Sequence, residues 1–134
     1  MNLERVHFLG NVPYATYKKV LQVSAVHVYL TYPFVLSWSL LEAMASGCLI
    51  VGSDTAPVKE VIKDGENGLL VDFFNASDVS ERVLDSLDHS ELFEGIRREA
   101  CGDARSYALD KGVVEYVRQL NLSAERRLYE VKLC

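Results

Sequence analysis

Two serines lie close together at a point where the chain is expected to pass from a loop into a helix. The loop from Tyr32 to Ser39 leads directly into an apolar helical stretch, and Ser37 and Ser39 stand at its start. Backbone N–H groups and the helix dipole make such a place attractive to an anion. The serine hydroxyls add donors, so a diphosphate would suit it. The alternative, which we favour on these residues alone, is that the serines only cap the helix.

An acidic residue follows one turn into the same helix. The carboxylate of Glu42 can accept hydrogen bonds from a pair of sugar hydroxyls, as acidic residues do in dinucleotide-binding folds. The alternative is a solvated surface glutamate, and we favour it when the residue is taken alone. The local sequence therefore leaves a ligand site and an ordinary capped helix both open.

The elements that must position these residues alternate along the chain. Short apolar runs predict strands at 6–9, 26–30, 49–51 and 69–71. Helical patterns are expected over 14–24, 40–45, 57–63, 77–87 and 91–108, with a further helix from residue 112. Such an alternation, with strands that are apolar throughout, predicts an α/β fold with a parallel sheet and flanking helices. Ligands bind outside the carboxyl ends of such strands, which here means the loops at 10–12, 31–39, 52–57 and 72–75.

Proline, glycine and serine residues indicate where several of these helices and strands begin or end. Pro13 opens the first helix and Pro33 ends the second strand, because proline cannot continue a strand ladder. Ser37 or Ser39 is expected to cap the next helix, and Gly47 to end it in the left-handed conformation.

Composition narrows the class of protein. The 134 residues fit one domain, and a net charge of -5 argues against a nucleic-acid partner. The apolar run from Ala25 to Ala45 contains Pro33 and Glu42, so we expect no transmembrane segment, while peripheral membrane contact stays open. The three cysteines and three histidines lack metal-ligand spacing, and no signal peptide is visible, so we expect a cytoplasmic protein without a bound metal.

Three motifs in order resemble a known family. They are the segments 40–51 (LLEAMASGCLIV), 57–62 (PVKEVI) and 64–71 (DGENGLLV). Together they look like the donor-binding domain of the retaining glycosyltransferases of family four, also called glycosyl transferases group 1. The resemblance covers roughly residues 5 to 110. It implies a Rossmann-like parallel sheet that forms a partial C-terminal domain of the two-domain GT-B fold.

The resemblance also implies an activity and a set of site residues. Members transfer a sugar from a nucleotide diphosphate donor with retention at the anomeric carbon, and no cofactor or protein-bound metal is expected. The second glutamate of the family's Glu-x7-Glu motif contacts the donor ribose, and Glu42 matches it. The preceding loop faces the diphosphate, and the loop after the first strand lies near the nucleobase. The implied donor-binding residues are Glu42, Ser37, Trp38, Ser39, Leu40, Gly10, Asn11 and Val12.

Two departures from the family pattern bear on activity. Phe34 occupies the position of the first glutamate, so no catalytic residue is assigned. Ser37-Trp38-Ser39 replaces the usual glycine-rich loop, and we expect Trp38 to pack under that loop as part of the core.

A third departure concerns length. The family's donor domain begins with two further strand–helix units, which carry the basic residues that neutralise the departing diphosphate, and these units and the acceptor domain have no counterpart in this sequence. Arg5 and Lys18 are the substitutes considered for those basic residues. We therefore expect the chain to be very slow or inactive by itself. Its expected partners are a nucleotide sugar, the missing acceptor domain or a second chain, and further copies that associate through an open sheet edge.

The domain organisation predicted from the sequence is a partial nucleotide-sugar-binding domain over 1–120 and a helical or frayed C-terminal tail over 121–134. Two alternatives stay open besides a transferase. One is a non-catalytic nucleotide-sugar-binding or assembly module of a split enzyme. The other is a nucleotide-sugar epimerase of the GT-B fold, although the segment Glu42-Ala43-Met44-Ala45 favours the transferase.

Overall fold

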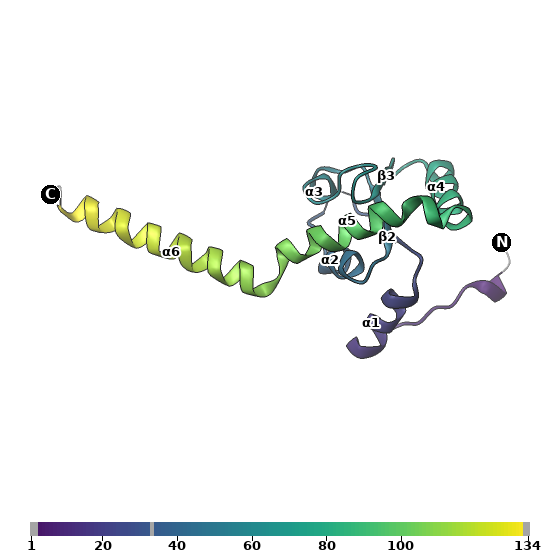
Figure 1. Ribbon diagram of the computed structural model, residues 1–134, viewed down its shortest axis with the longest axis horizontal. Coiled ribbons are helices and arrows are strands. Elements are labelled where there is room, and N and C mark those ends of the chain that lie inside the picture. Colours follow the sequence, from purple (N-terminus) through teal and green to yellow (C-terminus); the bar gives the residue numbers. More distant parts are fainter. Residues whose placement is uncertain (1–2, 33, 133–134) are drawn as a thin grey trace.

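A three-stranded parallel sheet forms the centre of the computed structural model, which describes residues 3–32 and 34–132. The strands are β1 (Val26–Tyr29), β2 (Leu49–Ser53) and β3 (Leu69–Val71), in the order β1-β2-β3. Val26 pairs with Leu49, and Val51 pairs with Leu69. The predicted α/β fold with a parallel sheet is confirmed (Figure 1).

Helices precede, connect and follow the strands. They are α1 (Tyr14–Val23), α2 (Trp38–Ala45), α3 (Ala56–Lys59), α4 (Ala76–Asp88), α5 (Glu94–Ala104) and α6 (Leu109–Lys132), with short 3-10 turns at Leu3–Arg5, Ser90–Phe93 and Arg105–Tyr107. Two of the predicted helices have different bounds in the structure. The helix expected over 57–63 ends at Lys59, and the one expected over 91–108 is α5 flanked by two 3-10 turns.

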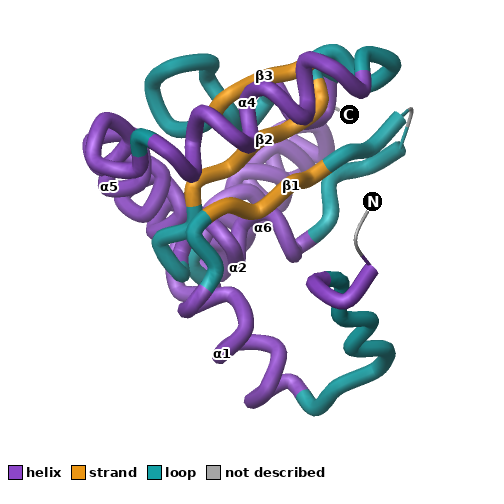
Figure 2. Tube along the Cα trace, turned by 90° about the vertical axis from the view of Figure 1, so that its right-hand side faces the viewer, coloured by secondary structure: helices purple, strands orange, loops and turns teal. Residues whose placement is uncertain are grey.

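Apolar side chains cover both faces of the sheet. On one face Ile50 packs with Leu40 and Met44 of α2 and with Val58 and Ile62. On the other, Leu49, Val51, Leu69 and Val71 pack against α4. All five residues of β2 are buried, because this strand has a neighbour on each edge and helices on each face (Figure 2).

A buried asparagine joins the loop before β3 to α5. The Asn67 side chain accepts a hydrogen bond from the Lys63 N–H (2.7 Å). Its amide donates to the Val61 carbonyl (2.9 Å) and to the Asp103 carboxylate (2.7 Å). A Cβ on the following Gly68 would lie 2.8 Å from Ile62 Cγ2. The Asn-Gly pair therefore serves packing as well as the turn.

The strand predicted at 6–9 is not formed. Residues 6–10 are irregular, and Phe8 is 92% exposed. A strand needs a neighbour that takes up its backbone N–H and C=O groups, and no strand of the described residues lies beside this segment. Among residues 3–32 and 34–132, β1 pairs with β2 only, so its outer edge is likewise unpaired.

Helix α6 extends away from the sheet (Figure 1). Its described side chains, through Asn121, are exposed. Glu115 accepts two hydrogen bonds from Arg118, at 2.9 and 2.8 Å, and this pairing lowers the pKa of the Glu115 carboxyl to about 2. Within the described residues, no helix is both long and apolar enough to cross a membrane.

The Asn67 contacts make a prediction about stability. Asn67→Ala should lower the free energy of unfolding by about 2–3 kcal/mol, because it leaves a buried carbonyl and a carboxylate without their donor. Urea unfolding followed by circular dichroism measures the change. Asn121→Ala, at an exposed position, is the matched control. A loss for Asn67→Ala no larger than the control's would contradict this role.

Candidate functional site

The start of α2 is held by its own serines. Ser37 is the N-cap, and its Oγ accepts hydrogen bonds from the Ser39 N–H (3.3 Å) and the Ser39 hydroxyl (3.1 Å). The Ser37 N–H donates to the Tyr29 hydroxyl (2.8 Å), which fixes the cap to the end of β1. The capping interpretation is therefore confirmed for Ser37, while a role in holding an anion stays a prediction.

Few backbone donors remain at this helix start. Leu40 is fully buried, and its N–H donates to the Ser37 carbonyl (3.2 Å). Within the described part of the chain, the Trp38 N–H donates no hydrogen bond. An anion at this end of α2 would thus meet the Trp38 amide, the Ser37 hydroxyl and the positive end of the helix dipole, because the Ser39 hydroxyl already donates to Ser37 Oγ.

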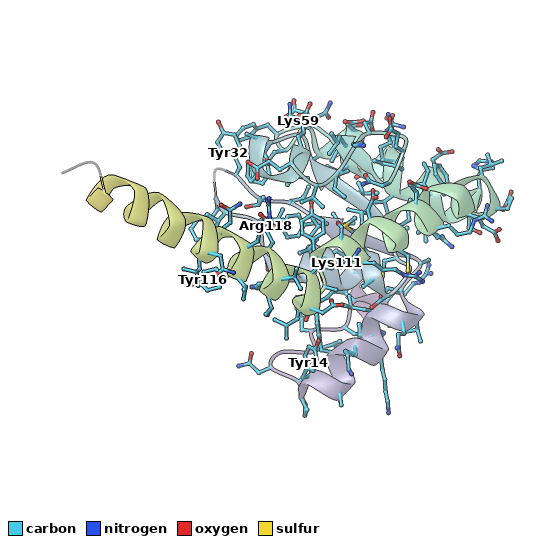
Figure 3. All side chains as sticks on the ribbon, turned by 60° about the vertical axis from the view of Figure 1, so that its left-hand side comes forward. Tyr14, Tyr32, Lys59, Lys111, Tyr116 and Arg118 are labelled. Atoms are coloured by element: carbon cyan, nitrogen blue, oxygen red, sulfur yellow. The ribbon has the colours of Figure 1, made fainter. Side chains whose placement is uncertain are left out.

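Helix α1 brings a tyrosine to Glu42. The Tyr14 hydroxyl donates to Glu42 Oε1 at 2.9 Å, across 28 residues of sequence. The Tyr17 ring lies 6.0 Å from the Tyr14 ring between centroids. Lys18 Nζ stands 5.3 Å from the centre of the Tyr14 ring. Figure 3 labels Tyr14 near the bottom of the view and Tyr32 and Lys59 near the top.

The Glu42 carboxylate also sets the electrostatics of this contact. The hydrogen bond to Glu42 raises the pKa of Tyr14. Burial first, and Glu42 second, raise the pKa of Tyr17 to about 12. The Tyr17 hydroxyl is buried and has no hydrogen-bond partner among the described residues. Both phenols therefore stay protonated beside a carboxylate.

The loop predicted to lie near a nucleobase leads into the same helix. Gly10 has a φ of 58°, a conformation that glycine adopts readily. Asn11 is exposed and Val12 is half-buried. Val12 precedes Tyr14 by two residues, so its backbone lies within about 7 Å of the tyrosine that contacts Glu42. The loop is therefore connected directly to the helix whose first residue, Tyr14, contacts Glu42.

Trp38 does not pack in the core, so that prediction was wrong. Its side chain is 75% exposed. Leu40, Ala43 and Met44 form the buried face of α2, and positions 38 and 42 lie on the opposite face at a spacing of four residues. Trp38 therefore shares the outer face of α2 with Glu42. Phe34, in the place of the family's first glutamate, is 71% exposed.

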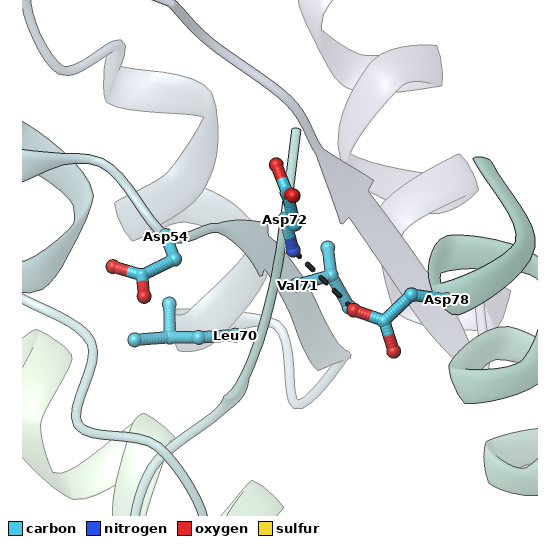
Figure 4. A pocket seen from close by; sticks show the side chains of 5 residues that line it. All are labelled: Asp54, Leu70, Val71, Asp72 and Asp78. Carbon is cyan, nitrogen blue, oxygen red and sulfur yellow. Dashed lines mark hydrogen bonds between the residues drawn. The ribbon is translucent and has the colours of Figure 1, made fainter. Parts of the chain in front are cut away.

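A shallow pocket of about 410 Å³ lies at the carboxyl ends of β2 and β3 (Figure 4). Its lining is Asp54, Leu70, Val71, Asp72 and Asp78. The Asp72 N–H donates to Asp78 Oδ2 (3.3 Å), and Lys59 pairs with Asp54 (2.6 Å). None of the predicted donor residues lines this pocket, and its carboxylates would repel a diphosphate. No group of His, Cys, Asp and Glu in the described residues could hold a metal ion.

The contact between Tyr14 and Glu42 was not predicted from the sequence. The available signal was the spacing of Tyr14 and Tyr17, which places both rings on one face of a helix. That spacing does not say which element the face meets. The remaining predicted donor residues are placed on two adjacent elements, α2 and the loop before α1.

Comparisons with known proteins address the family and the fold. The family model described as glycosyl transferases group 1 matches residues 1–103. The N,N'-diacetylbacillosaminyl-diphospho-undecaprenol alpha-1,3-N-acetylgalactosaminyltransferase of Campylobacter jejuni is 32% identical over 107 residues, which cover 80% of this chain and 28% of that protein.

Solved structures resemble the same region. Sucrose-phosphate synthase from Thermosynechococcus elongatus superposes with a TM-score of 0.77 at 19% identity, over 90% of this chain and 31% of that one. Anabaena HepE in complex with UDP and glucose superposes with a TM-score of 0.75 at 19% identity, over 90% and 32%. These two likenesses establish the fold alone. The chain spans less than a third of each of these three proteins.

The tyrosines beside Glu42 allow a prediction about pH. The folded protein holds the Tyr17 proton more tightly than the unfolded chain does, since the Tyr17 pKa rises from 10.0 to about 12. This contribution to stability is complete below pH 10 and is lost as the pH rises through about 12. Glu42→Gln removes the negative charge and should lower the pKa of Tyr17, as measured by phenolate absorbance in the folded protein. The same titration of Glu99→Gln, at an exposed position, should match the unsubstituted chain. An unshifted phenol titration in Glu42→Gln would rule out the electrostatic coupling.

Proposed function

We propose that this chain, which belongs to the glycosyl transferases group 1 family, is the part of a glycosyltransferase that binds the nucleotide diphosphate sugar donor. The observation that carries the proposal is the place of Glu42. Its carboxylate lies one turn into a helix that starts beyond the carboxyl end of β1, where ligands of parallel sheets bind. It also faces the helix that follows the Gly10–Val12 loop.

Each part of the donor has a proposed partner. The Gly10, Asn11 and Val12 loop lies beside the nucleobase, and Glu42 accepts the ribose hydroxyls. The Ser37 hydroxyl and the Trp38 amide donate to the diphosphate, and the Ser39 hydroxyl joins them by exchanging its hydrogen bond to Ser37 Oγ for one to the diphosphate. Leu40 is buried and its N–H is already bonded to Ser37, so its contribution is to fix the start of α2.

The proposed reaction transfers the sugar with retention. The bond between the anomeric carbon and the diphosphate oxygen breaks, and the oxygen of the acceptor hydroxyl takes its place on the same face of the sugar, while the hydroxyl proton passes to the departing diphosphate. Negative charge then develops on the departing diphosphate, and stabilising this charge is a large part of catalysis. Lys18 Nζ lies 5.3 Å from the centre of the ring of Tyr14, the residue that contacts Glu42, and is a candidate for part of this role. We therefore propose that the acceptor domain or a second chain completes the charge stabilisation.

One observation favours a second candidate function. Phe34 is an exposed apolar side chain where the family has the glutamate that faces the transferred sugar. A non-catalytic nucleotide-sugar-binding module of a split enzyme would need only the groups that recognise the nucleotide. This candidate would be favoured if the chain binds the nucleotide but turns over no nucleotide sugar. The turnover assay would be repeated after the acceptor domain or second chain has been added.

The free edge of β1 is the proposed site of association with another strand. β1 pairs with β2 on one edge only, and Val28 and Leu30 are 43% and 41% exposed. An unpaired edge with apolar residues invites a further strand. We propose that the strand comes either from another segment of a longer protein or from a second polypeptide, which includes another copy of this chain.

The proposed function makes a prediction about the affinity for nucleotides. UDP, GDP and ADP are titrated into the chain, with UDP first because HepE has been solved with it. Glu42→Ala should weaken the affinity of the best of the three by about 5- to 100-fold, the scale of hydrogen bonds to a charged group. Amide chemical shifts follow the binding, with Glu99→Ala as the control. If the Glu42→Ala chain is folded and its affinity for the nucleotide is unchanged, Glu42 does not bind the ribose.

The proposed association makes a prediction about the unpaired edge of β1. Val28→Lys places a charge on β1 and should lower the fraction of associated chain in sedimentation velocity, because an edge lysine opposes strand pairing. Lys19→Val changes the same two residue types in reverse at an exposed position of α1 and should leave that fraction unchanged. Association that is insensitive to Val28→Lys would place the contact elsewhere.

A further inference from the structure

We propose that Tyr14 is a positioning residue, whose hydroxyl holds the Glu42 carboxylate in the orientation that receives the ribose hydroxyls. The inference rests on the proposed function, since it concerns the same carboxylate. Its basis is the 2.9 Å hydrogen bond from the Tyr14 hydroxyl to Glu42 Oε1, made between α1 and α2.

Glu42 has enough acceptor sites to bind the Tyr14 hydroxyl and the two ribose hydroxyls at the same time. An ionised carboxylate offers about four lone-pair sites on its two oxygens. Tyr14 takes one site on Oε1, and Oε2 receives no hydrogen bond within the described residues. A ribose with two neighbouring hydroxyls therefore still finds an acceptor on each oxygen.

Tyr14 is also the group that orders this side chain. Glu42 lies on the outer face of α2, and among the described residues it forms no ion pair. The Tyr14 hydroxyl makes the direct hydrogen bond to it, while the Tyr17 hydroxyl is near enough for Glu42 to raise its pKa without completing a hydrogen bond of its own. A long side chain without an anchor would lose rotamer freedom when a ligand binds. With the Tyr14 bond in place, much of that ordering precedes binding.

Two side chains from the next turn of α1 lie beside the Tyr14 ring. The Tyr17 ring lies 6.0 Å from the Tyr14 ring at an interplanar angle of 32°, and the Lys18 ammonium stands over the Tyr14 ring at 5.3 Å. All three residues belong to α1, whose first turn follows the Gly10–Val12 loop. One helix would therefore link the loop beside the base to the carboxylate that binds the ribose.

The test compares a ribonucleotide with its 2′-deoxy counterpart. The nucleoside diphosphate that binds best among UDP, GDP and ADP is used with the corresponding 2′-deoxynucleoside diphosphate. Tyr14→Phe removes the hydroxyl and keeps the ring. It should weaken ribonucleotide binding about two- to tenfold, the scale of one hydrogen bond, and should weaken binding of the deoxy form less. The preference for ribose therefore shrinks. Tyr116→Phe, at an exposed position of α6, should leave the preference intact.

The outcomes separate this inference from the function on which it rests. An unchanged ribose preference in Tyr14→Phe, or tighter binding of the ribonucleotide, overturns the positioning role alone. A ribose preference that survives in Glu42→Ala overturns the assignment of Glu42, and a chain that binds no nucleotide overturns both. The Tyr14→Phe/Glu42→Ala double variant should show no smaller preference than Glu42→Ala alone, because the two residues act through one carboxylate.

Discussion

Burial of β2 on both faces and both edges is the constraint that orders the rest of the chain. Its five residues are inaccessible to solvent, and its backbone pairs with β1 on one side and β3 on the other. Parallel neighbours require crossover connections, so α2 must leave the carboxyl end of β1 and return along the sheet. That requirement places the Ser37 cap and Glu42 at the edge where parallel sheets bind ligands.

The features predicted correctly from the sequence are those that one segment determines by itself. Leu49-Ile50-Val51 is apolar enough to identify a buried strand. Gly47 ends α2 with a φ of 83°, as its position after the helix indicates. The cap at Ser37 depends on atoms two residues apart. In each case the physical cause lies within a few residues.

The features that were predicted wrongly, or not at all, depend on distant partners. Val6–Leu9 has the composition of a strand, but a strand forms only beside another strand, and no strand of the described part of the chain lies next to this segment. The burial of Trp38 depends on which face of α2 meets the sheet, and the apolar residues Leu40, Ala43 and Met44 decide it. Tyr14 meets Glu42 across 28 residues, a separation that no local pattern reports.

The proposed donor site is an open surface built from two helices, and this bears on what the chain can do. The groups assigned to the nucleotide lie on the outer face and first turn of α2 and at the start of α1, whereas the pocket at the ends of β2 and β3 carries carboxylates. An open face of this kind can recognise a ribose and a diphosphate through hydrogen bonds. It excludes little water, and electrostatic stabilisation of a departing diphosphate is strong only where water is excluded. Under the proposed function, recognition of the donor would therefore reside in this chain, and efficient transfer would require a second surface that closes over α2 and supplies positive charge.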